Sequence, residues 1–521
     1  MRARRALVLG ATAALVLTAC APASREDWTP PSWQQGMVHT TEPVDEIEAS
    51  GPLAPALLPI RLRNDELGIQ ARVTLLPEGP TTTTFNAAVE QHLRGAIDGR
   101  VAASGVAYAP SAPPAGAGLG DRRCTLESTR RPAADLLADS ALGPAGGMGT
   151  AVVCGIVLAT GPFLGERLRV VTGEEGTVVS DSTAIVYADV LTGEAIAADG
   201  LWAGGAAEAL SAGIVESVRR EAGALSQRPA SAGDEGQLAA IRAALSSTVP
   251  SAEGFVITLA PGFVSPDLAA LGVPPTTEPI SIAVPPNVAA PLVSPFGARV
   301  LATLAEPYAG PLAAPAGDRT IDCALVPCVA LTYDDGPSGL TPAILDELSA
   351  RDGAATFFAM GENARGHAET LARMTREGHE VEGHTWNHPH LPRLTPREVA
   401  AQIQDSTRAL EAASGQRITA FRPPYGEFTP EVLAAAGMPA ILWDVDALDW
   451  QGPSDDVLTG RAVTQPRPGS IVLLHDIHER TARTAGAVMD GLLDRGFVLV
   501  TVRQLFGGEL PASGAWRRAP G

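Results

Sequence analysis

Two adjacent carboxylates, Asp334 and Asp335, follow an apolar run in the stretch VALTYDDGPSG. An apolar, β-branched run closed by Gly-Pro is typical of a buried strand that ends in a turn. Successive side chains of an extended segment point to opposite sides. The sequence therefore predicts different roles for the two acids.

A pair of histidines offers the first role. His384 and His388 stand four residues apart in HTWNHPH, so a helical turn would present both imidazoles to one metal ion. A carboxylate completes a site of two histidines and one acid that leaves positions open for water and substrate. We expect Asp335 to be that ligand and Asp334 to stay uncoordinated, as the base that takes a proton from water. The alternative for Asp334 is a turn cap.

Three further polar residues follow apolar runs later in the chain. Arg422, confined by Pro423 and Pro424, is suited to holding a carboxylate in place. His475 can protonate a leaving group if Asp449 keeps it charged. The alternatives are an ordinary surface arginine and a structural histidine.

Short apolar runs alternate with helical stretches around all these residues. The runs are CVALTY, ATFFAM, HEVEGH, AILWDVD, SIVLLHD and FVLVTV. Such alternation predicts parallel βα units. Catalytic groups gather at the carboxyl ends of the strands in such folds, so the polar clusters should converge on one pocket.

Five motifs carry a family resemblance. TYDDGPS, HTWNHPHL, FRPPYG, DVDALDW and IVLLHDIH, in this order, resemble the motifs of the polysaccharide deacetylase (NodB homology) family, the family-four carbohydrate esterases. Tyr333 stands where the family more often has Phe. The resemblance implies an α/β protein with a distorted (β/α) barrel at the C-terminus. It also implies metal-dependent removal of N- or O-linked acetyl groups from a polysaccharide.

The resemblance assigns roles residue by residue. Asp334 is expected to be the general base and Arg422 to pair with it. His475 is expected to be the general acid and Asp449 to orient it. The implied ligands of a divalent metal, usually zinc, are Asp335, His384 and His388.

Further roles concern the substrate. The backbone N–H of Tyr425 is expected to help bind the oxyanion, which suits the electrostatics of acyl transfer. Trp450 and Leu473 are expected to wall the acetyl pocket. His367 and His379, which match no motif position, are expected to be surface or packing residues.

The first twenty residues, MRARRALVLGATAALVLTAC, have a basic start, a short apolar core and small residues before Cys20. This pattern predicts a secretory signal. A cysteine directly after it resembles the bacterial lipobox, in which that cysteine is lipidated. We therefore expect an extracytoplasmic lipoprotein, anchored through Cys20 to the bacterial cell membrane. The alternative is an ordinary signal with an incidental cysteine.

Four cysteines remain after Cys20, an even number for an oxidising compartment, so two disulfides are expected. We predict that Cys124 pairs with Cys154 and that Cys323 pairs with Cys328. The alternative is free buried thiols. Zinc binding by these four is disfavoured, because the two pairs lie far apart and neither has CxxC spacing.

Composition argues against one class of function and excludes another. A formal net charge of -20 at pH 7 argues against nucleic acid as a partner. All 38 basic residues are arginine, which excludes chemistry that needs a lysine nucleophile.

The chain of 521 residues predicts more than one domain. After the signal of residues 1–20 we expect a Pro- and Ser-rich tether over 21–50 and a smaller α+β domain over 51–305. A linker over 306–320 and the deacetylase-like domain over 321–510 follow. The α+β region also resembles the uncharacterised domain that precedes some peptidoglycan deacetylases. Its expected role is binding or positioning, and the alternative is a spacer.

Together these features predict an enzyme that deacetylates cell-envelope polysaccharide, with the N-acetylglucosamine of peptidoglycan as the leading substrate. One alternative is an O-acetyl xylan or chitin-type deacetylase, which would share the same site. Another is a wall-binding or sensing protein without activity. The presence of Asp334 and His475 argues against that last alternative, because metal binding needs neither.

Overall fold

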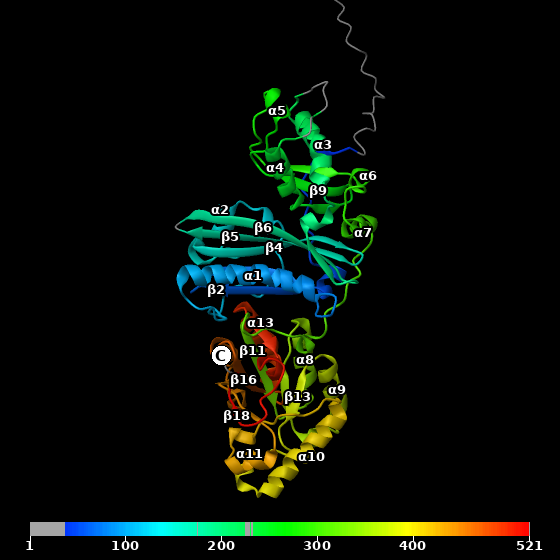
Figure 1. Ribbon diagram of the computed structural model, residues 1–521. Coiled ribbons are helices and arrows are strands. Elements are labelled where there is room, and N and C mark those ends of the chain that lie inside the picture. Colours follow the sequence, from blue (N-terminus) through cyan, green and yellow to red (C-terminus); the bar gives the residue numbers. More distant parts are fainter. Residues whose placement is uncertain (1–36, 175, 225–229, 231–232, 520–521) are drawn as a thin grey trace, which may run out of the picture.

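The computed structural model describes residues 37–519, apart from 175, 225–229 and 231–232. These residues form three tiers stacked along one axis (Figure 1). A four-stranded sheet lies in the upper tier, a six-stranded sheet in the middle tier and the motif-bearing strands in the lower tier. The predicted signal, Cys20 and the first part of the predicted tether lie outside the described residues.

The upper tier is an antiparallel sheet in the order β1, β10, β9, β8. Its strands are β1 (His39–Thr41), β8 (Val249–Ser251), β9 (Gly254–Leu259) and β10 (Ile280–Val284). Helices α3 (Ala206–Glu221) and α4 (Glu235–Leu245) pack against it. Leu210, Ile214 and Val218 of α3 are buried in the core of this tier.

The middle tier is a sheet in the order β2 to β7 along the chain. Its strands are β2 (Leu58–Asn64), β3 (Ile69–Leu75), β4 (Gly149–Thr160), β5 (Phe163–Glu174), β6 (Thr177–Asp189) and β7 (Glu194–Ala197). Helix α1 (Thr83–Ser104) lies along this sheet (Figure 1). Its residues Phe85, Val89, Leu93 and Ile97 are buried at four-residue spacing, which gives the helix one apolar side.

Two predictions for the region before the lower tier are wrong. Part of the predicted tether over 21–50 is folded, because β1 pairs with β10 and Ile47 forms a bridge with Ile156. The reason is the apolar content of this segment: Val38 is buried against the core of the upper tier. The expected smaller α+β domain consists of two separate sheets and covers more of the chain than the lower tier. The boundaries 51–305, 306–320 and 321–510 stay predictions.

The lower tier is built on parallel strands in the order β13, β12, β11, β16, β15. These are β11 (Cys328–Asp334), β12 (Thr356–Ala359), β13 (Glu380–Gly383), β15 (Val445–Asp446) and β16 (Ser470–His475). The helices around them are α8 (Thr341–Ala350), α9 (Ala368–Arg376), α10 (Pro396–Ser414), α11 (Pro430–Ala436), α12 (Asp455–Thr464) and α13 (Glu479–Asp494). All seven residues of β11 are buried, as expected of a central parallel strand.

Single parallel bridges close this sheet into a ring. Gly383 at the end of β13 pairs with Phe421, and Phe421 pairs with Ala440 of β14 (Ala440–Ile441). The chain then continues into β15, which returns to β16. Strand β17 (Val498–Val500) pairs with the first three residues of β11, so the ring is irregular. The predicted distorted (β/α) barrel is confirmed.

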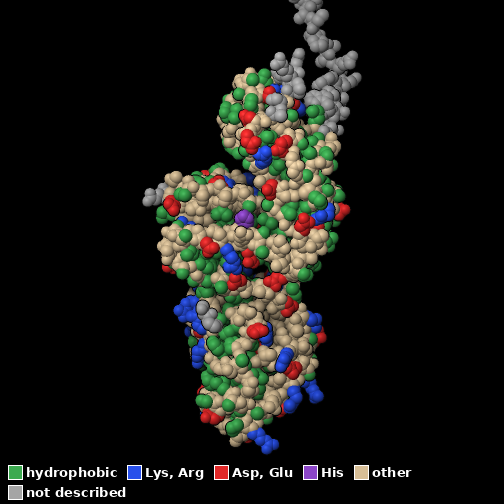
Figure 2. Space-filling view, viewed as in Figure 1, with side chains coloured by type: hydrophobic (Ala, Val, Ile, Leu, Met, Phe, Trp, Pro, Cys, Tyr) green, Lys and Arg blue, Asp and Glu red, His purple; other side chains and the backbone are tan. Residues whose placement is uncertain are grey.

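The amino ends of the barrel strands face the middle tier. Segment 105–123 crosses from α1 onto the barrel, where the Asp494 carboxylate accepts hydrogen bonds from Gly116 N at 2.7 Å and Gly118 N at 2.8 Å. Arg94 on α1 pairs with Asp322 at 2.8 Å, and charged side chains of both signs gather at this junction (Figure 2). The carboxyl ends of the strands therefore point away from the middle tier.

Replacing Asp494 by alanine tests this junction. Loss of two backbone hydrogen bonds should let segment 105–123 open more often, so trypsin should cut after Arg122 and Arg123 about fivefold faster or more. Asp456→Ala, an exposed acid of α12, is the control. Equal cleavage rates in the two variants of the full chain would contradict this placement of the segment.

Candidate active site

The two adjacent acids stand at the carboxyl end of β11 and diverge there. Asp334 is the last residue of the strand and is buried. Asp335 takes a left-handed backbone conformation, with φ of 74°. Asn363 Nδ2 donates a hydrogen bond to the Asp335 carbonyl at 2.9 Å and steadies this turn. The two carboxylates therefore lie in different surroundings, as their position after a strand predicts.

Asp335 lies beside the two predicted histidines. Its Oδ1 atom is 3.3 Å from His384 Nε2 and 3.5 Å from His388 Nε2. The expectation of a helical turn is wrong: residues 385–387 form a tight turn, and both Thr385 and His388 have positive φ. That turn still brings the two imidazole rings to 5.0 Å.

The donor atoms of this trio fit a divalent cation. His384 Nδ1 donates to the Arg422 carbonyl at 2.8 Å, which leaves the Nε2 lone pair facing the trio. Asp335 Oδ1 is buried and has no hydrogen-bond partner among the described residues. Two ligands of a tetrahedral zinc ion are about 3.4 Å apart, given metal–ligand distances of about 2.1 Å. The measured separations of 3.3 and 3.5 Å agree with that spacing.

The charges of the trio also suit a cation. Burial opposes ionisation of Asp335, but the neighbouring imidazoles, that of His384 above all, hold its pKa at about 2. Burial and the neighbouring His384 lower the pKa of His388, which favours its neutral form. An ionised carboxylate and a neutral imidazole are the forms that bind metal.

Arg422 holds the other carboxylate. Its Nη1 donates to Asp334 Oδ1 at 2.7 Å and to Thr332 Oγ1 at 2.7 Å. Its Nε donates to Ile441 O at 2.9 Å and its Nη2 to Leu442 O at 3.0 Å. The side chain has no exposed surface, so the guanidinium fixes Asp334 from inside the barrel.

His475 and Asp449 form a second pair. Asp449 Oδ1 accepts a hydrogen bond from His475 Nδ1 at 2.8 Å, and Thr481 Oγ1 donates to Asp449 Oδ2 at 2.6 Å. Burial opposes the charge of His475. The bond to Asp449 and the charges of Asp334, Asp449 and Asp335 outweigh burial and raise the pKa of His475 to about 9. At neutral pH this histidine is therefore protonated at both nitrogens. Asp449 accepts from Nδ1, so the proton on Nε2 is not used by Asp449.

Tyr425 lies in the turn after Arg422 and contacts the loop that carries His388 and His390. It has φ of 61°, and its ring lies 4.6 Å from that of His388. The ring of His390 stacks on it with centroids 4.0 Å apart, and His390 Nδ1 is 3.2 Å from Glu427 Oε2. This stack holds the two loops together.

The residues expected to wall a pocket lie in different surroundings. Trp450 is 56% exposed and follows Asp449 in the chain, whereas Leu473 is buried in β16. Their shared role as pocket walls stays a prediction.

The structure also brings in residues that motif spacing did not reveal. Thr332 supports Arg422, Thr481 supports Asp449, and Asn363 holds the carbonyl of Asp335. Thr332 is two positions before Asp334, so strand alternation predicts its side. Thr481 and Asn363 reach the site from a helix and a loop, which one sequence does not place.

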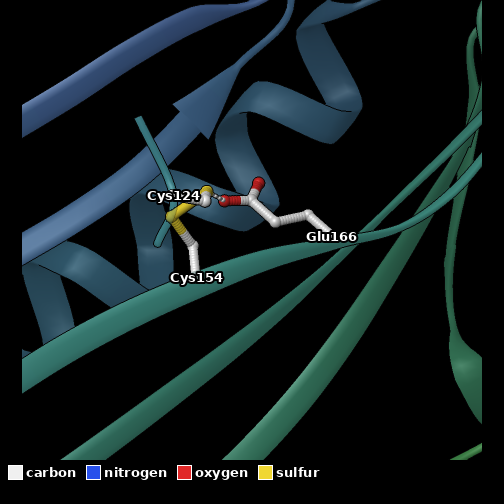
Figure 3. A group of neighbouring side chains, drawn as sticks. All are labelled: Cys124, Cys154 and Glu166. Carbon is white, nitrogen blue, oxygen red and sulfur yellow. Dashed lines mark hydrogen bonds between the residues drawn. A yellow bond between two sulfur atoms is a disulfide. The ribbon is translucent and has the colours of Figure 1, made fainter. Parts of the chain in front are cut away.

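A second cluster lies in the middle tier, where Glu166 approaches Cys124 and Cys154 (Figure 3). The two cysteines are joined in a disulfide, so their sulfur atoms are not available to a metal. Glu166 Oε1 accepts a hydrogen bond from Thr74 N at 2.8 Å, and burial raises the pKa of Glu166 well above its usual range. This cluster is structural.

Both predicted cysteine pairs are present. Cys124 is bonded to Cys154, and Cys323 is bonded to Cys328 at the start of β11. The alternative of free buried thiols is therefore wrong for these four cysteines.

Comparisons with known proteins find similarity in the lower tier. The family model described as "Polysaccharide deacetylase" matches residues 323–440. A peptidoglycan-N-acetylmuramic acid deacetylase of Bacillus subtilis is 42% identical over 178 residues, which are 34% of this chain and 38% of that protein. A peptidoglycan-N-acetylglucosamine deacetylase of Listeria monocytogenes is 37% identical over 183 residues, or 35% of this chain and 39% of that protein.

A third relative is shorter. The chitooligosaccharide deacetylase of Sinorhizobium fredii is 35% identical over 196 residues, which are 34% of this chain and 91% of that protein. The chain thus spans less than two fifths of the length of the first two relatives and nearly all of the third.

Replacing His388 by alanine tests the metal trio. Loss of one of three ligands should raise the dissociation constant for zinc by about 100-fold or more. The measurement is calorimetric titration of the metal-free chain, with His39→Ala in the upper tier as the control. Equal zinc affinity in both variants would place the metal elsewhere.

Proposed function

Because this chain belongs to the polysaccharide deacetylase family, we propose that it hydrolyses acetyl groups of a cell-wall polysaccharide, with N-acetyl groups of peptidoglycan N-acetylglucosamine favoured. The arrangement that supports this proposal is a set of two ion pairs beside the metal trio, Asp335, His384 and His388. Arg422 fixes Asp334 and Asp449 fixes His475, so a base and an acid are held in place around one cation site.

The reaction adds water to the acetyl carbonyl carbon and breaks the bond to nitrogen, which releases acetate and a free amine. A bound divalent cation, for which we propose zinc held by Asp335, His384 and His388, supplies a Lewis acid that polarises the carbonyl and makes water more acidic. Asp334 accepts the proton of the attacking water through Oδ2, while Arg422 holds Oδ1.

The leaving nitrogen needs a proton in the second half of the reaction. His475 donates it from Nε2, because Asp449 accepts from Nδ1 and fixes the orientation of the ring. The backbone N–H of Tyr425 donates to the developing oxyanion. The stack of Tyr425 on His390 supports that position.

The substrate proposal rests on the relatives and on the amino terminus. Two of the relatives are named as peptidoglycan deacetylases and one as a chitooligosaccharide deacetylase. We propose that Cys20 is lipidated and anchors the chain to the outer face of a bacterial membrane, where the wall is in reach. No helix among the described residues is long and apolar enough to cross a bilayer.

Two other functions stay open to test. A chitin-type or O-acetyl xylan deacetylase would use the same groups on another polymer. A wall-binding protein without activity would need the metal trio alone, whereas both ion pairs are intact here.

Acetate release by the full chain tests the function. Wild type, loaded with zinc, should release acetate from peptidoglycan, N-acetylglucosamine oligomers or acetylated xylan, and chelation should stop release until zinc returns. Asp334→Asn should lower kcat by about 10² to 10⁴ because the base is lost, while zinc affinity stays as in wild type. The matched control is Asp346→Asn, an exposed acid on α8.

The outcomes separate the three functions. The polymer that releases acetate identifies the substrate class. No release from any polymer, with one zinc bound per chain, would favour the wall-binding protein. Full activity in Asp334→Asn would remove this residue from the reaction.

The pH dependence tests the acid. His475 must be protonated to donate, so kcat should fall as pH rises through its pKa. Asp449→Asn removes a charge that raises this pKa, so the alkaline limb of the profile should move to lower pH by about one unit. An alkaline limb that stays in place would assign it to another group, and Asp346→Asn again serves as the control.

A further inference from the structure

A cavity of about 970 Å³ lies at the junction between the middle tier and the lower tier. The middle tier lines it with the start of β2, the end of β3, the first half of α1 and segment 120–123. The lower tier lines it with segment 319–326, the turn at 350–352 and β17. The amino ends of the barrel strands face this junction, so the cavity lies at the opposite end of the barrel from the candidate active site. No residue of that site lines it.

Strand β2 offers a free edge to this cavity. It is the outer strand of the six-stranded sheet and pairs with β3 alone, and residues 58–61 all line the cavity. Thr74 N donates to Glu166 instead of to Pro59, its partner in the register, so this pair makes no hydrogen bonds across the strands. The N–H and C=O of Arg61 then point outward, where no main-chain group of the described residues bonds to them. An extended peptide can add to such an edge.

Three arginines at this junction lack an acidic partner. The side chains of Arg61, Arg72 and Arg122 donate to main-chain carbonyls, and none of them forms an ion pair among the described residues. The carboxylate of Asp121, beside Arg122 in the chain, pairs with Arg123 at 3.1 Å. Cations without an acidic partner thus stand beside this cavity, in a chain whose formal net charge is -20.

The surroundings of these arginines favour a bound anion. Burial, and after it the neighbouring Arg72, lower the pKa of Arg61 to about 10. Burial also lowers the pKa of Arg122 to about 10. Both guanidinium groups stay charged at neutral pH, and a buried charge is stabilised by a partner of opposite sign.

Arg122 is the arginine that a ligand can reach. It is half-buried and lines the cavity, and its Nη2 donates to the carbonyl of Phe497 in the lower tier. Its Nη1 donates to none of the described residues. Arg61, by contrast, is buried, and its Nη1 and Nη2 already donate to three carbonyls. A guanidinium with free N–H groups binds a carboxylate strongly.

Apolar side chains from both tiers complete the wall. Leu58 and Ile60 of β2 are half-buried and line the cavity, as do Leu493 and Val498 of the lower tier. The volume lies at the upper end of the range of ligand sites. An inorganic anion would use Arg122 alone, and a fatty acid would use Arg122 and the apolar wall. A short peptide with a carboxylate would use the free strand edge as well, so it matches all three features.

We propose that this cavity binds a short extended peptide that carries a carboxylate, with its main chain paired to β2 and its carboxylate bound by Arg122. The proposal goes beyond the proposed function, because it needs neither the metal trio nor the two ion pairs of the candidate active site. It gives the region before the barrel, whose expected role is binding or positioning, a ligand of defined chemistry.

Calorimetric titration of the full chain tests the proposal. The probe is the pentapeptide Ala-Val-Glu-Val-Ala, capped at both ends, and its analogue with Gln in place of Glu lacks only the charge. Wild type should bind the Glu peptide about tenfold or more tightly than the Gln peptide, because the charged partner of a guanidinium is lost in the analogue.

Variants assign this difference to one residue. Arg122→Gln should weaken binding of the Glu peptide by a similar factor and leave the Gln peptide unaffected. Arg122→Lys, which keeps the charge, should restore most of the affinity. Arg408→Gln is the control, because Arg408 is an exposed residue of α10 that lines no part of the cavity.

Two measurements on wild type need no variant. Two Glu peptides carry N-methyl groups, one at both valines and the other at Glu and the last Ala. Alternate N–H groups of a strand point to opposite sides, so one of these peptides should bind about tenfold more weakly and the other should bind as the unmethylated peptide does. Saturating Glu peptide should also slow cleavage by trypsin after Arg122 and Arg123.

The contrary results are distinct. No binding of the Glu peptide to wild type, or equal binding to wild type and Arg122→Gln, would overturn the proposal. Equal binding of the unmethylated peptide and both methylated forms would overturn the strand pairing, and binding of dodecanoate in its place would assign the cavity to an apolar acid. Acetate release takes no part in these measurements, so they are independent of the proposed function.

Discussion

The buried ion pair between Arg422 and Asp334 is the interaction on which the lower tier depends. The guanidinium has no exposed surface, and each of its nitrogen atoms donates a hydrogen bond to β11 or to the segment 441–442. A buried charge left without its partner costs several kcal/mol. Closure of the barrel and the placement of Asp334 therefore depend on the same guanidinium, and loss of either partner affects both the fold and the chemistry.

Backbone strain is concentrated around the same place. Among the described residues, seven that are not glycine have positive φ, and five of them flank the site: Asp335, Thr385, His388, Tyr425 and Leu448. Side chains in this conformation cost free energy unless the surroundings impose it. The hydrogen bond from Asn363 supports this conformation at Asp335, and the ring stack with His390 supports it at Tyr425, so part of the folding free energy is used to position these two residues.

The sequence predicted the parts of the site that depend on strand ends. Register explains this success, because Asp334 of β11 and His475 of β16 are direct partners in the parallel sheet. Groups that follow buried strands converge whatever the loops do. The left-handed turn at His388 and the stack of His390 on Tyr425 depend on loop paths, which local patterns do not encode. The folded strand β1 was missed for a related reason, because its partner β10 lies more than 200 residues away.

The barrel presents its strand carboxyl ends away from the middle tier, while β1, the first described strand, lies in the upper tier at the other end of the molecule (Figure 1). The first described strand and the candidate active site therefore lie at opposite ends of the molecule. Under the anchoring proposed at Cys20, a change in the height of the upper two tiers would move the candidate active site nearer to or farther from the membrane, without altering any residue of that site. In that proposal the length of the upper two tiers sets which layer of the polysaccharide lies within reach, while the barrel sets which bond is broken.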